Sequence, residues 1–133
     1  MADKAVDRLV LQHPDKTFSH GLFSAGLVVD GWVFVSGQGP LDMKTGQLVA
    51  GTIEVETALT IRHIEAILQQ SGASLADVVK CTCYLADLDD FPGFNKTYGE
   101  LFPDPMPTRA TIGARLLKGM KVEIETVARL SGS

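Results

Sequence analysis

The sequence predicts an α+β fold in which a single mixed β-sheet carries two helices packed on one face. Short runs of alternating apolar and polar residues indicate strands, and two longer stretches with apolar residues three and four positions apart indicate helices. The elements follow one another as strand, hairpin, helix, strand, helix and two strands. Because 133 residues is an ordinary length for one domain, we expect a single domain over residues 1–133.

The composition argues against several classes of function. Hydrophobic residues make up 45% of the chain and charged residues 21%, as in globular proteins. A net charge of −4 argues against a nucleic-acid-binding surface, which needs clustered Lys and Arg. No apolar run approaches the roughly 18 residues of a membrane helix, and the charged amino-terminal segment does not resemble a signal peptide. We expect a cytoplasmic protein with no nucleic-acid and no membrane partner.

Three strands are expected in the first third of the chain. Residues 8–11 form a short apolar run that ends at His13-Pro14-Asp15. The runs 26–29 and 32–36 flank Asp30-Gly31, and an Asp-Gly pair between apolar runs is a strong signal of a two-residue hairpin.

Two glycines follow the hairpin and invite comparison with a phosphate-binding loop. Gly37 and Gly39 come directly after a strand, but Pro40 is next and no helix opens there, so the dinucleotide-binding fingerprint is not met. A backbone N–H beside so small a residue can still meet an anion.

A long helix is expected after this loop. Thr52 can cap its start, acidic residues occupy its first turn, where the helix dipole favours them, and Ser71-Gly72 ends it. His63 lies beside the apolar stripe, and we expect a partly exposed surface residue there rather than a metal ligand. The expected buried stripe comprises Ile53, Thr57, Thr60, Ile61, Ile64 and Leu68.

A strand carrying both cysteines is expected at residues 77–85. Its apolar face would consist of Val79, Cys81, Cys83 and Leu85. Two same-face positions on one strand have poor disulfide geometry, and no second ligand pair stands at zinc-like spacing. We therefore expect buried, reduced thiols and no metal site, which favours the cytoplasm.

The second helix should begin near Asp89 or Asp90, with Pro92 in its first turn. Asn95 lies at the edge of the apolar stripe, where it is either solvated or directed at a site. Three prolines end the helix, and the stripe that we expect to be buried comprises Phe94, Tyr98, Leu101 and Phe102.

The last two strands, at residues 107–115 and 120–125, carry the most suggestive chemistry. Arg109 and Thr111 share one side of the first strand, and Glu123 lies on the charged side of the second. Each strand therefore has an apolar face, which we expect under the helices, and a charged face. A lone guanidinium and a lone carboxylate suit a small anionic substrate and an attacking water.

Self-association is expected because two helices can cover only one face of such a sheet. Trp32 and Phe34 point opposite to Val33 and Val35, so this strand is apolar on both sides. Monomers rarely leave so large an apolar face in water. The charged sides of the last two strands would then line a contact between subunits.

Four segments, in their order and spacing, resemble the RidA/YjgF family of reactive-intermediate deaminases over nearly the full chain. The resemblance implies a chorismate-mutase-like fold assembled as a homotrimer, with three clefts between subunits. It also implies hydrolysis of 2-imino acids, formed from enamines that pyridoxal-phosphate dehydratases release, to 2-keto acids and ammonia without a cofactor. The four segments are Val35-Ser36-Gly37-Gln38, Phe94-Asn95-Lys96-Thr97-Tyr98, Pro107-Thr108-Arg109 and Lys121-Val122-Glu123-Ile124-Glu125.

The resemblance also implies roles for individual residues. The family arginine that grips the substrate carboxylate falls on Arg109, and the glutamate that positions water falls on Glu123. The hairpin-end serine falls on Ser36, the glycine whose backbone meets the ligand falls on Gly37, and the family asparagine falls on Asn95.

The chain departs from the family pattern at two of its expected substrate-binding positions. Phe23 stands where many members have a tyrosine, which removes a hydroxyl, and Thr111 stands where several have a cysteine. The loop between Arg109 and Glu123 also looks one residue shorter than in the commonest members.

Two readings of the charged pair, and two functions, stay open. Arg109 and Glu123 either bind a ligand or form a salt bridge between subunits that orders the assembly. The chain is either an imine/enamine deaminase or a non-catalytic trimer that binds small carboxylates as a sensor, which the missing tyrosine hydroxyl favours. The acidic composition fits poorly with RNA cleavage. Lys121 is assigned to the surface or an interface, and His20 could edge the cleft.

Overall fold

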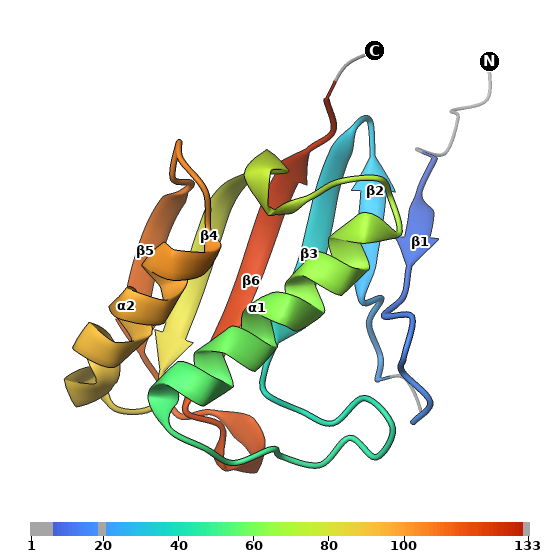
Figure 1. Cartoon of the computed structure of the whole chain (residues 1–133). Helices are drawn as coiled ribbons and strands as arrows, with labels where there is room; N and C mark the ends of the chain where they lie inside the picture. Colours follow the sequence, from blue (N-terminus) through green and yellow to red (C-terminus); the bar gives the residue numbers. More distant parts are fainter. Residues whose placement is uncertain (1–6, 19–20, 132–133) are drawn as a thin grey trace.

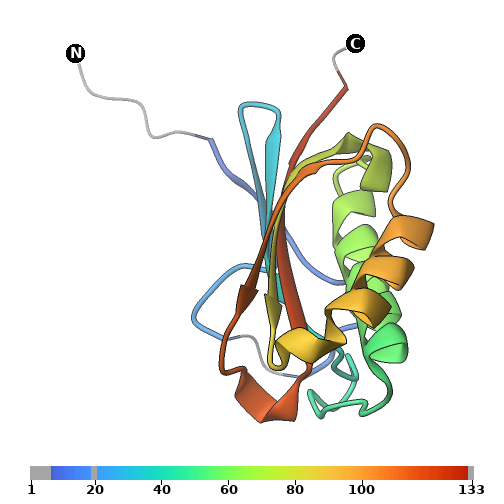
Figure 2. The ribbon, with the colours of Figure 1, turned by 90° about the vertical axis from the view of Figure 1, so that its left-hand side faces the viewer.

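The computed structural model describes residues 7–18 and 21–131, so His20 lies outside the described residues. Six strands form one sheet in the order β1-β2-β3-β6-β4-β5. Two helices cross one face of it, and the other face is open (Figures 1 and 2). The strands are β1 Leu9–Leu11, β2 Gly26–Val29, β3 Trp32–Gln38, β4 Val78–Leu85, β5 Thr108–Gly113 and β6 Val122–Arg129; the helices are α1 Ile53–Gln69 and α2 Phe91–Leu101.

The predicted mixed sheet with two helices on one face is confirmed. Strand β5 runs parallel to β4, and every other neighbouring pair is antiparallel. The predicted hairpin joins β2 to β3, with Val29 opposite Trp32 and positive φ angles of 50° at Asp30 and 80° at Gly31. Two positive φ angles fit the right-handed twist of the paired strands, which is why an Asp-Gly pair suits this turn.

Both helices begin and pack largely as the sequence predicts. The Thr52 side chain caps α1 by accepting a hydrogen bond from the backbone N–H of Val55, at 3.2 Å. All six residues of the predicted stripe are buried. Asp90 precedes α2 but makes no capping hydrogen bond. On α2, Phe94, Tyr98 and Phe102 are buried and Leu101 is partly buried against the core. No helix among the described residues is long and apolar enough to cross a membrane.

One strand face differs from the prediction. Val78 is buried and Val79 is exposed, the reverse of the expected alternation. The pairing of β4 with β6 shifts register between Val78 and Lys80. Because of this irregularity, the first residues of β4 have their buried and exposed sides exchanged. From Cys81 onward the predicted apolar face holds.

The open face of the sheet is apolar in its β1–β3 half, as the sequence predicts. Val10, Leu27, Phe34 and Val127 stand side by side on four neighbouring strands. Phe34 is 45% exposed. This row is a surface that a second protein surface can cover.

His63 is buried, which makes the prediction of a surface residue wrong. Its Nε2 lies 2.7 Å from the carbonyl oxygen of Leu41, and its Nδ1 lies 2.9 Å from Nε2 of His13. The backbone N–H of Asp15 donates to Nδ1 of His13 at 3.1 Å. Because the carbonyl can only accept, all four ring nitrogens are satisfied when both rings are neutral. The pair ties the segment after β1 and the loop after β3 to α1.

Burial lowers the pKa of both histidines from their ordinary value of 6.5, and for His13 the neighbouring His63 lowers it further. The charge of Asp15 raises the pKa of both histidines, but by less than burial lowers it. At His63 the Leu41 carbonyl and Asp42 also raise the pKa, whereas at His13 the charge of Lys16 lowers it further. The folded chain therefore takes up these protons less readily than the unfolded chain.

We expect the free energy of unfolding to fall as the pH drops below about 6.5, because the unfolded chain then binds more protons on these two residues. The slope from these groups should be on the order of 1 kcal/mol per pH unit. Urea denaturation between pH 7 and pH 5 measures it. A variant with both His13→Gln and His63→Gln should have a flatter profile, and an equally steep profile in that variant would rule out the pair as the cause.

Candidate functional site

A cavity of about 640 Å³ lies at the end of the sheet where β3 ends and β6 begins. It receives side chains from the segment after β1, from the loop after β3 and from the turn before β6. Four of the residues singled out in the sequence line it: Phe23, Ser36, Gly37 and Glu123.

The carboxylate of Glu123 lies directly against the backbone of Gly37. A Cβ atom added to Gly37 would lie 2.5 Å from Oε2 of Glu123, well inside van der Waals contact. Any other residue at position 37 would therefore displace the carboxylate. This close approach gives the glycine a physical reason in this chain, independent of any family resemblance.

Two forces raise the pKa of Glu123. Partial burial is the larger, because it disfavours the charged form, and the negative charge of Glu125 adds to it. Glu125 is two residues along β6 on the same open face, and it accepts a hydrogen bond of 2.6 Å from the Tyr84 hydroxyl. Glu123 is thus a carboxylate whose proton affinity is tuned upward, as a general base needs.

A second, fully buried carboxylate fixes the start of β6, and the sequence did not reveal this role. Glu56 on α1 accepts hydrogen bonds from the backbone N–H of Lys121 at 2.8 Å and from that of Gly51 at 3.2 Å. It also forms an ion pair with the Lys121 ammonium at 3.2 Å. Lys121 is therefore an anchor for β6 rather than a free surface charge, and it stands two residues before Glu123.

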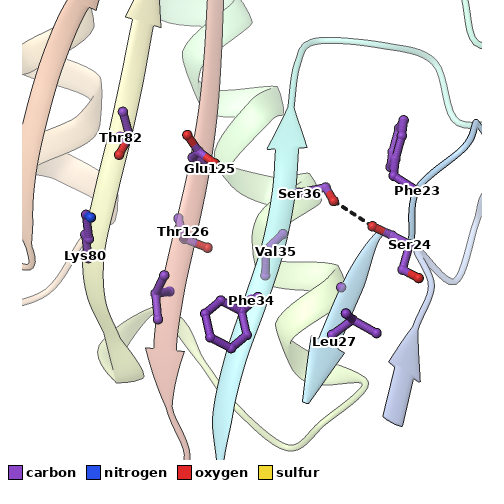
Figure 3. Close-up of a pocket in the computed structure, with 12 residues that line it drawn as sticks. Phe23, Ser24, Leu27, Phe34, Val35, Ser36, Lys80, Thr82, Glu125 and Thr126 are labelled. Atoms are coloured by element: carbon purple, nitrogen blue, oxygen red, sulfur yellow. Dashed lines mark hydrogen bonds between the residues drawn. The ribbon is translucent and has the colours of Figure 1, made fainter. Parts of the chain in front are cut away.

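A second cavity, of about 430 Å³, lies on the open face and shares Phe23 and Ser36 with the first. Figure 3 shows these two residues at one edge and Lys80, Thr82 and Glu125 across the sheet from them. The Ser36 hydroxyl donates to the Ser24 carbonyl oxygen at 2.6 Å, which leaves the serine oxygen as an acceptor.

Arg109 lies on the opposite face of the sheet from Glu123. In the β4–β5 pairing it stands beside Cys81, which is buried beneath the helices, and its guanidinium carbon lies 4.7 Å from the centre of the Tyr98 ring on α2. Glu123 stands beside Tyr84, and Ile112 of β5 flanks the same tyrosine on that open face.

The expectation that the apolar side of β5 lies under the helices is therefore wrong. Ile112 is 46% exposed on the open face, whereas Arg109 packs against α2. At the sheet edge, helix α2 offers the guanidinium aromatic rings to stack on while its nitrogens still reach water. Among the described residues no carboxylate forms an ion pair with Arg109.

Two other residues singled out in the sequence also lie outside the cavity that contains Glu123. Thr111 is half-buried on β5, beside Cys83 and on the same face as Arg109. Asn95 is exposed on α2, one helical turn after Phe91, whose ring lies 5.6 Å from the Arg109 guanidinium carbon. The candidate residues thus form two groups: Arg109 and Thr111, with Asn95 nearby on α2, and Glu123 with Phe23, Ser36 and Gly37.

The cysteines are free and buried, as the sequence predicts. Burial, together with the neighbouring Cys81, raises the pKa of Cys83 to about 12. Both thiols therefore stay protonated, and they do not act as nucleophiles at neutral pH. In the described part of the chain no three residues of the His, Cys, Asp and Glu types cluster as a metal site would require.

Comparisons with known proteins find close similarity. A family profile described as Endoribonuclease L-PSP matches residues 15–130. A RutC family protein of Pyrococcus abyssi is 43% identical over 109 residues, which cover 81% of this chain and 86% of that protein. A protein of Dermatophagoides farinae named 2-iminobutanoate/2-iminopropanoate deaminase is 35% identical over 108 residues, 80% of this chain and 84% of its own length.

The fold matches solved structures equally well. The crystal structure of E. coli TdcF with bound serine superposes with a TM-score of 0.84 at 30% identity and covers 92% of this chain and 99% of the other. An α+β fold with one sheet and two helices is therefore shared with a structure that holds a small amino acid.

We expect Glu123 to titrate above the ordinary glutamate value of 4.5, because burial and Glu125 both favour its protonated form. Removing the neighbouring charge by Glu125→Gln should lower this pKa without restoring the ordinary value, since burial remains. Carboxyl-detected NMR titration measures both. The control Glu65→Gln, a partly buried residue of α1 that pairs with Arg62, should leave the Glu123 titration unchanged. An unchanged pKa in the Glu125 variant would contradict the account.

Proposed function

This chain belongs to the endoribonuclease L-PSP family, which is the YjgF/RidA family, and from that premise we propose that it hydrolyses reactive 2-imino acids to 2-keto acids and ammonia. The observation that supports this most is that the chain carries both groups the reaction needs: a carboxylate with a raised pKa, Glu123, and a guanidinium, that of Arg109, which no carboxylate within the described ranges neutralises.

In this proposal Arg109 binds the substrate carboxylate. A planar guanidinium can donate two parallel charge-assisted hydrogen bonds to a carboxylate, which fixes the neighbouring C2 carbon in space. Hydrogen bonds to charged groups contribute on the order of 1.5–3 kcal/mol each. Thr111 and Asn95, near Arg109, are proposed to contact the same substrate.

Glu123 positions the water and accepts its proton. The water oxygen attacks the C=N carbon while one water proton passes to the carboxylate, which returns it to the imine nitrogen to give a neutral carbinolamine. The remaining hydroxyl proton then passes through the same carboxylate to the nitrogen, the C–N bond breaks, and ammonia leaves as the C=O bond of the 2-keto acid forms. An imine is already electrophilic, so placement and a base are sufficient. The backbone of Gly37, the Ser36 oxygen and the Phe23 ring would line the pocket on this side.

A homotrimer with its sites between subunits reconciles these roles with the placement of the two residues. Strand β4 separates β5 from β6, and Arg109 and Glu123 project from opposite faces. The Arg109 of one copy can meet the Glu123 of another if the open apolar face is the contact between copies. We propose that no cofactor, nucleic acid or membrane takes part. The cytoplasm is the proposed location, since both thiols are free and buried.

One observation favours a second candidate, a trimer that binds small carboxylates without turning them over. Phe23 lines the cavity beside Glu123, and its ring offers no hydroxyl to handle water or substrate. Such a protein would act as a sensor or as a regulator of another protein. Cleavage of RNA, which the family description suggests, fits poorly with a net charge of −4.

The deciding experiment couples a threonine or serine dehydratase to this protein and follows decay of the imine. We expect faster decay with the wild type and a loss of at least about tenfold in Arg109→Ala, because charge-assisted hydrogen bonds are lost. Glu123→Gln should keep carboxylate binding and lose the acceleration. Arg62→Ala, on the surface of α1, is the matched control and should behave as the wild type. Carboxylate binding with no acceleration by the wild type would favour the sensor instead.

A further inference from the structure

Three aromatic rings of α2 lie around the Arg109 guanidinium and form what we call the α2 shelf. The guanidinium carbon is 5.6 Å from the ring centre of Phe91, 5.5 Å from that of Phe94 and 4.7 Å from that of Tyr98. All three distances fall within the range of about 6 Å over which a cation is attracted to a ring. The spacing of these residues along the helix stacks their side chains on one side of it.

This arrangement holds a positive charge without using its hydrogen-bond donors. An ion pair would occupy guanidinium N–H groups and compete with an incoming carboxylate, whereas a ring face attracts the cation and leaves the N–H groups free. In the parts of the chain that the structure describes, none of the salt bridges involves Arg109. The aromatic rings therefore orient the Arg109 guanidinium, and its charge and N–H groups stay available for a carboxylate.

The three rings differ in how much else depends on them. Phe94 is 0% exposed and Tyr98 is 4% exposed, so both also build the core, whereas Phe91 is 38% exposed at the first position of α2. Removing the Phe91 ring should loosen Arg109 with little effect on the fold. Removing the Tyr98 hydroxyl should leave the ring, and therefore the shelf, in place.

We propose that Phe91 and Tyr98 are positioning residues that preorganise Arg109 for a carboxylate ligand, with Phe91 the separable one. Arginine has many rotamers in water, and binding to a loose arginine costs the entropy of ordering it. The shelf orders the guanidinium before the ligand arrives, so affinity depends on rings that need not touch the ligand. This inference rests on the proposed role of Arg109 in binding a carboxylate.

The test uses Phe91→Leu and Phe91→Tyr in the full chain, with 2-oxobutanoate as the probe. In Phe91→Leu we expect the dissociation constant to rise about two- to fivefold, the loss typical of an exposed cation–ring contact, and the melting temperature to stay unchanged. Phe91→Tyr keeps an aromatic ring beside the guanidinium and should therefore keep the affinity that Phe91→Leu loses. For turnover, KM should rise more than kcat falls.

A ligand-free readout separates this inference from the proposed function. Protons held over an aromatic ring resonate upfield, so the Arg109 Nε–H signal should shift upfield in the wild type and move toward its ordinary position in Phe91→Leu. An unchanged signal in that variant would overturn the shelf, as would wild-type affinity. If the wild type neither binds nor turns over substrate while the signal still follows Phe91, the proposed function fails and the shelf is supported.

Discussion

The sheet stands between the two charged side chains on which the proposed chemistry depends. Arg109 leaves the edge strand toward α2, and Glu123 leaves β6 toward the open face. A small imino acid cannot bridge them through a packed β-sheet, so the site that we propose needs a second copy of the chain. The apolar row of Val10, Leu27, Phe34 and Val127 gives that second copy a physical reason to bind, because water contact with such a surface is unfavourable.

Around Glu123, buried contacts fix the position of the carboxylate. Buried Glu56 fastens the residue before β6 to helix α1, and Gly37 brings backbone against the carboxylate. The histidine pair ties two loops near the same cavity to α1. Around Arg109 the support is aromatic instead, since an acidic partner would neutralise the charge. In our proposal both halves of the site are preorganised, each by interactions suited to the charge it holds.

The sequence predicts well those features that depend on local interactions. The Asp30-Gly31 hairpin and the Thr52 cap follow from the backbone preferences of a few neighbouring residues. The buried stripes of the helices follow from the helical spacing of apolar residues, which the sequence shows directly. It does not predict which face of β5 meets the helices, because this edge strand carries small residues on both faces and only one charge, Arg109, which fits against the helices once α2 supplies its aromatic rings.

The sequence does not predict the burial of His63 and Glu56 for a related reason. His63 pairs with His13, 50 residues away, and Glu56 pairs with Lys121, 65 residues away. The residues next to each in the sequence do not indicate such a partner. Four of the residues that the sequence singles out line one cavity, and their roles there stay predictions, whereas the folded structure places Arg109 on the other face of the sheet.

Subunit complementation tests the central claim most directly. Arg109→Ala and Glu123→Gln, each inactive alone, are unfolded together and reassembled in equal amounts. If each site takes Arg109 from one copy and Glu123 from another, random assortment leaves about a quarter of the sites intact, and imine hydrolysis should return to about that fraction of the wild-type rate. Reassembled mixtures that form normal oligomers but stay as inactive as the separate variants would contradict a site shared between copies.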